Sequence, residues 1–141
     1  MLLLYLVSII FLNYPVVMEI NIQGIDAEKG LDLCEGDLNT YLNLLRCYVT
    51  DVENALTGIK NISEETIKQY AACAHTIKGV SLAVGAEELS SKAKNMELMA
   101  KGGDYNSVTA RNAAFIYSAE NLVSNVRQWL KMYEGTKTSK N

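Results

Sequence analysis

Proline and cysteine are scarce in this chain, and each scarcity excludes a class of structure. Pro15 is the only proline among 141 residues, so no residue from Val16 onward is barred from a helix by a missing amide or a ring clash. The three cysteines, Cys34, Cys47 and Cys73, form an odd number without C-x-x-C spacing. This pattern favours reduced thiols in a cytosol over a disulfide framework or a zinc site.

Strong positive charge and phosphate-binding loops are also lacking. The net charge is -3 and the isoelectric point is near 5.2, which argues against the clustered basic face that nucleic-acid binding needs. No segment matches the glycine-rich patterns G-x-x-x-x-G-K-[ST] or G-x-G-x-x-G, so the sequence predicts no ATP site. We therefore expect one domain with a single core and with no cofactor or metal site of its own.

What the sequence does contain is helical periodicity. Five helices are expected, a short one over about residues 27–34 and long ones over about 37–59, 63–85, 86–101 and 106–133. Four long amphipathic helices with short loops predict an all-α fold, an antiparallel four-helix bundle with a short additional N-terminal helix. The expected core positions are Leu38, Leu42, Leu45, Val49, Val52, Leu56 and Ile59; Ile67, Tyr70, Ala74, Ile77, Ser81 and Val84; Leu89, Ala93, Met96 and Ala100; and Val108, Phe115, Ala119, Leu122, Val126, Trp129 and Tyr133.

The expected helix ends depend on capping residues and glycines. Asp37 and Ser63 are predicted as N-caps of two long helices. Gly58 is expected to loosen the first of these near its end, Gly85 to end the second, and Gly135 to end the last helix. We accordingly expect a domain over residues 19–135 and a disordered polar tail over residues 136–141.

His75 is the only histidine in the chain. At about 100° per residue it lies about 140° from the middle of the apolar stripe of its helix, so it should face solvent. Histidine has an unperturbed pKa of about 6.5, so at cellular pH much of it is neutral. The neutral ring has a nitrogen with a free lone pair. A lone histidine is by default a satisfied structural residue, but the outward phase makes His75 a candidate phosphoryl acceptor.

The neighbours of His75 on the helix surface suit that role. Lys78, three residues on, is close enough to offset the charge of a group attached to the ring. Gly79 costs about 1 kcal/mol relative to alanine in a helix interior, and it leaves bare backbone beside the imidazole for a partner to approach. The alternative is that Gly79 relieves a close helix crossing. The residues expected to line the docking surface are Lys68, Ala71, Ala72 and Leu82.

Several segments together resemble a known family. Residues 74–79 (AHTIKG), 84–89 (VGAEEL) and 101–104 (KGGD) closely resemble the histidine-containing phosphotransfer (Hpt) domain of bacterial phosphorelays. Residues 24–31 (GIDAEKGL) and 35–37 (EGD) look like the leading segment of Hpt domains found at the end of hybrid sensor kinases. The likeness covers nearly everything after the first 18 residues.

The resemblance implies a function and assigns residues to it. Such a domain shuttles phosphoryl groups between aspartates on receiver domains in the cytoplasm, with a hybrid sensor histidine kinase and response regulators as partners. It has no ATP site, and Mg²⁺ belongs to the receiver. His75 would be the phosphorylated residue, Lys78 would stabilise charge and Gly79 would give access. A polar residue from the next helix often approaches the imidazole in this family, and Glu97 has the matching spacing.

Residues 1–18 form a separate apolar segment. They carry no charge, but Asn13 and Pro15 interrupt them, and a membrane-spanning helix needs about 20 mainly apolar residues. A basic start and a small-residue cleavage site are also missing. The segment is a short membrane anchor, the end of an upstream segment, or a translation start assigned too early, with Met18 as the true start. We favour the last because the family-like sequence begins near Met18, and we expect membrane attachment only if the anchor is real.

Two other classes of function stay open. The chain could be the N-terminal phosphotransfer domain of a chemotaxis-type histidine kinase, phosphorylated by an ATP-binding domain instead of a receiver. It could also be a helical interaction module whose His75 is never phosphorylated. A kinase core encoded downstream would favour the first, and the absence of acid-labile phosphate would favour the second.

Overall fold

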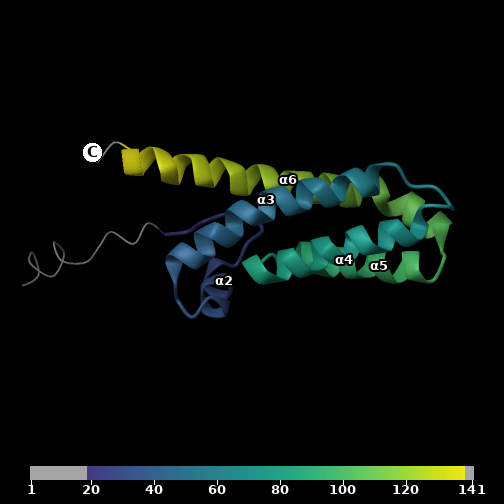
Figure 1. Cartoon of the computed structure of the whole chain (residues 1–141), viewed down its shortest axis with the longest axis horizontal. Helices are drawn as coiled ribbons and strands as arrows, with labels where there is room; N and C mark the ends of the chain where they lie inside the picture. Colours follow the sequence, from purple (N-terminus) through teal and green to yellow (C-terminus); the bar gives the residue numbers. More distant parts are fainter. Residues whose placement is uncertain (1–18, 139–141) are drawn as a thin grey trace, which may run out of the picture.

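The computed structural model describes residues 19–138, and these residues form five helices and no strand (Figure 1). The interpretations of residues 1–18 and the last part of the polar tail lie outside this range. The helices are α2 (Ala27–Leu33), α3 (Leu38–Lys60), α4 (Ile67–Val84), α5 (Glu87–Lys101) and α6 (Tyr105–Thr138). The predicted all-α class is therefore confirmed.

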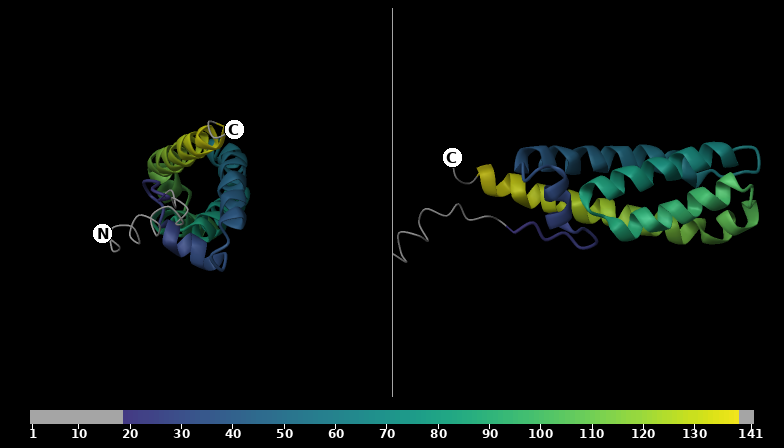
Figure 2. Two further views of the ribbon diagram at one scale, coloured as in Figure 1. Left: turned by 90° about the vertical axis from the view of Figure 1, so that its left-hand side faces the viewer. Right: turned by 90° about the horizontal axis from the view of Figure 1, so that it is seen from below.

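The four long helices pack side by side around one core. Each helix contacts the next in the order α3, α4, α5 and α6, and α6 returns to α3, which closes the bundle. Consecutive helices run in opposite directions, and Figure 2 shows the bundle from its end and from below. The short helix α2 packs at one end of the bundle against α3 and α4. None of the helices within residues 19–138 is long and apolar enough to cross a membrane.

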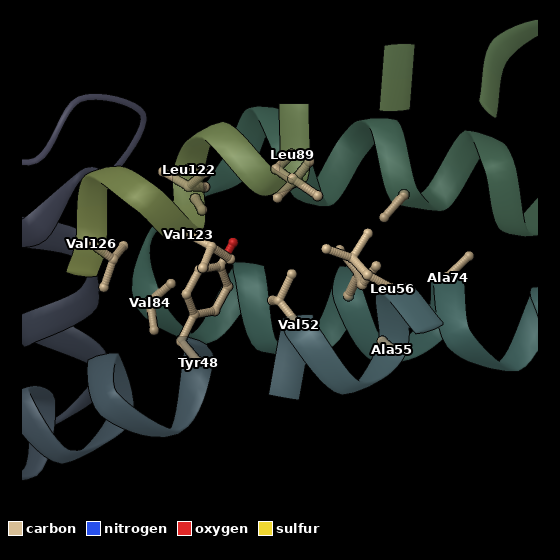
Figure 3. Close-up of a cluster of buried hydrophobic side chains, with 14 of the residues drawn as sticks. Tyr48, Val52, Ala55, Leu56, Ala74, Val84, Leu89, Leu122, Val123 and Val126 are labelled. Atoms are coloured by element: carbon tan, nitrogen blue, oxygen red, sulfur yellow. The ribbon is translucent and has the colours of Figure 1, made fainter. Parts of the chain in front are cut away.

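The core follows the predicted stripes, with aromatic residues added to them (Figure 3). Tyr41 and Tyr48 of α3 are fully buried, although the periodicity of the aliphatic residues did not include them. The Tyr41 hydroxyl donates to the Val84 carbonyl at 2.8 Å, and the Tyr48 hydroxyl pairs with Ser81 Oγ at 3.3 Å. These bonds satisfy the polar end of each ring inside the core. Leu38 was expected in the stripe but is 41 % exposed, because it is the first residue of α3 and lies beyond the packed part of the bundle.

Two of the predicted helix starts have different outcomes. Asp37 caps α3 as predicted, since its carboxylate accepts from the Thr40 amide at 3.2 Å. Ser63 does not cap α4, and that prediction was wrong. Residues 63–66 form a turn in which the Ser63 and Thr66 side chains bond to each other's amides, so α4 begins only at Ile67.

Of the three glycines predicted to loosen or end a helix, one does so and two do not. Gly85 ends α4 as expected, with a φ of 90° that favours glycine. Gly58 does not loosen α3, which continues to Lys60; instead it allows close approach of α4, because a Cβ at Gly58 would lie 2.5 Å from Cys73 Sγ. Gly135 does not end α6, which continues through Thr138, so the first part of the predicted disordered tail is helical.

The C-terminal end of α4 is bonded to several parts of the chain. Within the turn, the Gly85 amide donates to the Leu82 carbonyl and the Ala86 amide to the Ser81 carbonyl, at 3.2 and 2.8 Å. From outside the turn, the Asp26 amide donates to the Gly85 carbonyl at 2.9 Å. The Tyr41 hydroxyl, also from outside the turn, donates a hydrogen bond to the Val84 carbonyl. The helix that carries His75 is therefore fixed in place at this end.

Candidate functional site

His75 lies near the middle of α4 and points away from the core. Its side chain is 63 % exposed, whereas Ala74 and Ile77 on either side of it are fully buried. The predicted phase of this helix is therefore confirmed. A histidine in such a position is accessible to another protein while its backbone is held rigidly by the bundle.

Glu97 of α5 contacts the imidazole. His75 Nδ1 and Glu97 Oε1 are 2.8 Å apart, and only 3 % of the Glu97 side chain is exposed. Glu97 shares its helix with the buried residues Ala93, Met96 and Ala100, so it is held at the α4–α5 interface. Glu97, which the sequence offered only as the residue with the family's spacing, does contact the imidazole.

Two lysines share the same carboxylate. Lys78 Nζ lies 2.8 Å from Glu97 Oε2, and Lys101 Nζ lies 2.7 Å from Oε1. Lys78 comes from the His75 helix, whereas Lys101 is four residues after Glu97 on α5. The role of Lys101 was not predicted, although Glu97 and Lys101 have the i, i+4 spacing at which a glutamate and a lysine pair on one helix.

The charges around Glu97 keep its carboxyl group ionised, and the ionised carboxylate determines which nitrogen of the imidazole donates to it. Hydrogen bonds from Lys101 and then Lys78 lower the pKa of the Glu97 carboxyl from 4.5 to about 2, against the opposing effect of burial. An ionised carboxylate can only accept hydrogen bonds, so His75 Nδ1 is the donor in their contact. In the neutral imidazole this leaves the lone pair on Nε2. Nε2 is therefore the nitrogen whose lone pair is free in the neutral ring.

Gly79 leaves open space beside His75. A Cβ built at Gly79 would meet no atom within 4 Å, although α4 packs against two other long helices. The interpretation that Gly79 relieves a close helix crossing is therefore wrong. The open backbone lies one turn beyond His75 on the same face of α4, so no side chain at position 79 stands beside the imidazole.

The family comparison identifies the family to which this fold and this site belong. The family model of the Hpt domain matches residues 38–134, which include α3, α4, α5 and most of α6. The chain belongs to the Hpt domain family. Membership implies a histidine phosphotransfer role in phosphorelays and interaction with receiver domains of response regulators. No curated protein and no solved structure matches the chain.

The Hpt domain has a shallow depression directly beside His75. It is lined by Lys68, Ala71, Ala72, His75, Thr76, Glu97, Ala100 and Lys101. Three of these lining residues are alanines, whose small side chains leave room beside the ring for an attached group. Ala71 was expected on the exposed face but is only 5 % exposed, because α5 packs over that side of α4; it lines the depression without projecting from it.

The other predicted docking residues are spread over a wider face of the Hpt domain. Lys68 and Ala72 are exposed beside His75. Leu82 is 55 % exposed and lies in a separate groove with Gly79, where Leu33 of α2 also lines the surface. Docking by these residues stays a prediction. Among residues 19–138 there is no group of three or more His, Cys, Asp or Glu side chains placed to hold a metal ion.

Proposed function

We propose that this protein carries a phosphoryl group on His75 Nε2, accepting it from an aspartate of one receiver domain and passing it to another. The observation that carries the proposal is the hydrogen bond between His75 Nδ1 and the ionised Glu97 carboxylate, made by an imidazole that is otherwise exposed. It orients the ring and leaves the lone pair on the accessible nitrogen. The family match supports the same role.

The transfer step needs no covalent partner other than the imidazole. The Nε2 lone pair forms the N–P bond as the bond from phosphorus to the aspartate oxygen breaks, and that oxygen keeps the electron pair. The proton on Nδ1 stays in place, so the ring becomes cationic beside the Glu97 carboxylate. Lys78, which already contacts Glu97, is placed to stabilise charge on the phosphoryl oxygens.

The partner supplies the rest of the machinery in this proposal. The Mg²⁺ that stabilises the aspartyl phosphate belongs to the receiver, and the protein uses no cofactor of its own. The donor is the receiver of a hybrid sensor histidine kinase, and the transfer takes place in the cytoplasm. The resemblance of residues 24–31 and 35–37 to Hpt domains of that kind supports this assignment.

The test is to follow label from a phosphorylated receiver to the protein. Wild-type protein should gain phosphate that is labile in acid and stable in alkali, as a phosphoramidate is, whereas His75→Gln should gain none. ATP alone should give no labelling, since no nucleotide-binding motif is visible in the sequence. His75→Gln that still takes up acid-labile phosphate would rule out the proposal.

The same experiment distinguishes the chemotaxis-type alternative. Purified ATP-binding kinase domains of that class should fail to label His75 when receivers succeed. Labelling by such a domain, with no transfer from any phosphorylated receiver, would replace the shuttle with that alternative.

A further inference from the structure

We propose that Lys101 is a second cationic contact for the phosphoryl group on His75, acting from α5 while Lys78 acts from α4. This inference rests on the proposed function, because it concerns the phosphorylated state of the same site. Its starting point is the sharing of one carboxylate oxygen. His75 Nδ1 and Lys101 Nζ both contact Glu97 Oε1, at 2.8 and 2.7 Å. The ammonium group is therefore no farther from the ring nitrogen than the sum of those two distances.

Lys101 retains hydrogen-bonding capacity after its contact with Glu97. An ammonium group has three N–H donors, and the Glu97 contact uses one of them. Its side chain is also largely exposed, so the remaining donors can reach a group brought to His75. Lys78 has similar capacity, since its contact with Glu97 Oε2 also uses a single donor.

The depression beside His75 places Lys101 where a phosphoryl group has room. Lys101 and Lys68 are cationic residues that line it, and Glu97 supplies a carboxylate. Glu97 already has two lysines around it, so this part of the surface has an excess positive charge before phosphorylation. A phosphoryl group with a charge near -2 would balance that excess.

The charge that develops during the transfer step indicates what Lys101 would do. As the N–P bond forms and the P–O bond to the receiver aspartate breaks, the ring becomes cationic and pulls more strongly on Glu97 Oε1. Lys101 and Nδ1 share that oxygen, so a stronger bond from Nδ1 frees Lys101 to turn toward the phosphoryl oxygens. Its positive charge then stabilises the product on His75.

The experiment compares Lys101→Ala with wild type, using two phosphoryl donors. One donor is a phosphorylated receiver, and the other is phosphoramidate, a small molecule that has no docking surface. Lys131→Ala is the matched control, because Lys131 is an exposed lysine of α6 without an ion pair among the described residues, and it removes the same charge away from the site. Melting temperatures of all variants establish that the fold is intact.

We expect Lys101→Ala to slow phosphorylation of His75 about tenfold with both donors, as the loss of one charge-assisted hydrogen bond does. Lys101→Arg keeps the charge and should recover most of the rate, whereas the uncharged Lys101→Gln should not. Lys131→Ala should react at the wild-type rate with phosphoramidate.

Three results would overturn part or all of this inference. Unchanged rates in Lys101→Ala would overturn it while leaving the proposed function in place. Slowing with the receiver alone would make Lys101 a docking contact, which also contradicts a role at the phosphoryl group. Wild-type protein that neither donor labels would overturn the proposed function itself, and the inference with it.

Discussion

At the scale of single residues, the site depends on one carboxylate with three partners. Glu97 accepts from His75, Lys78 and Lys101 although it is almost completely buried. Burial alone would favour the protonated acid, and the lysines reverse that preference. The carboxylate therefore stays charged near neutral pH, and there the orientation of the imidazole does not depend on titration of Glu97.

The lowered pKa of Glu97 predicts an acid-dependent part of the stability. A group whose pKa is lower in the folded protein stabilises the fold above its unfolded value, here 4.5, and this contribution is lost as the pH falls toward about 2. We expect Glu97→Gln to show a weaker decrease in the free energy of unfolding across that range, measured by urea denaturation. Glu65→Gln is the control, because Glu65 is exposed and has no ion pair within residues 19–138. Parallel curves for wild type and Glu97→Gln would contradict the prediction.

Lys78 should matter for transfer and little for folding. Its side chain is partly exposed and its ion pair is with Glu97. We expect Lys78→Ala to slow receiver-to-His75 transfer about tenfold, the effect of losing one charge-assisted hydrogen bond, with a melting temperature close to wild type. Rapid-quench measurements at low and moderate salt would test this. A rate that is the same for Lys78→Ala and wild type at both salt concentrations would remove Lys78 from the mechanism.

At the scale of helices, two interior glycines have opposite environments. A Cβ at Gly79 would enter open space, whereas one at Gly58 would lie 2.5 Å from Cys73 Sγ. Alanine in a helix interior is favoured over glycine by up to about 1 kcal/mol. We therefore expect Gly79→Ala to raise the free energy of unfolding by up to that amount, and Gly58→Ala to lower it by about 1 kcal/mol through overpacking. Urea denaturation of both variants tests the contrast.

A second substitution identifies the cause at Gly58. Combining Gly58→Ala with Cys73→Ala removes the sulfur atom that the new methyl group would meet, so the double variant should recover stability relative to Gly58→Ala. A Gly58→Ala protein that is as stable as wild type would show that the close approach of α3 and α4 does not require a glycine at position 58.

Gly79 should also separate stability from transfer. A glutamine at position 79 is tolerated by the fold because the space is open, yet it would stand where a receiver must approach. Reacting atoms must come within about 3–3.5 Å, and a displacement of about 1 Å can cost on the order of a hundredfold in rate. We expect Gly79→Gln to keep its melting temperature and to lose transfer on that order. A stable Gly79→Gln protein with wild-type transfer would exclude docking at this position.

Helix existence could be predicted from the sequence more reliably than helix ends. Apolar spacing of three and four residues identified the four long helices, because burial of one face determines that spacing. The ends depend on local bonds that the pattern does not contain. Ser63 has the right chemistry for an N-cap, but its side chain bonds to Thr66 within a turn. Gly135 has the right conformational freedom to end α6, but the helix continues beyond it.

At the scale of the whole molecule, a buried polar contact joins three helices on the core side of α4. The Tyr70 hydroxyl of α4 donates to Asn112 Oδ1 of α6 at 2.8 Å, and Asn112 Nδ2 donates to the Ile59 carbonyl of α3 at 2.8 Å. Both side chains are buried, so neither partner can turn to water. The relative position of three helices thus depends on one amide group.

Removal of that amide should destabilise the bundle. Asn112→Ala leaves the Tyr70 hydroxyl and the Ile59 carbonyl without their partner, which costs about 1–3 kcal/mol for each buried group left unsatisfied. We expect a free energy of unfolding lower by at least about 2 kcal/mol, measured by urea denaturation. The control is Asn121→Ala, at an exposed position of the same helix, which should be as stable as wild type or slightly more so because alanine favours the helix. Similar losses in both variants would argue against the buried contact.

The site could be predicted from the sequence only in part. His75, Lys78 and Gly79 lie within one turn or so of a single helix, so helical geometry alone relates them. Glu97 was found through the family's spacing, and its contact with His75 depends on how α4 and α5 pack. Lys101 was missed because it reaches the site through its contact with Glu97, and helical periodicity does not show that Glu97 lies beside His75. Residues that act across two helices require the tertiary structure.

The bonded end of α4 also has a consequence for how the molecule opens. The last carbonyls of a helix usually bond to water, and such ends fray. Here the carbonyls of Ser81, Leu82, Val84 and Gly85 all have partners, two of which come from Asp26 and Tyr41 in other segments. Amide protons in this part of α4 should therefore exchange with solvent only when the segment around Asp26 and helix α3 also separate from α4. The end of the helix would then open only with the bundle as a whole.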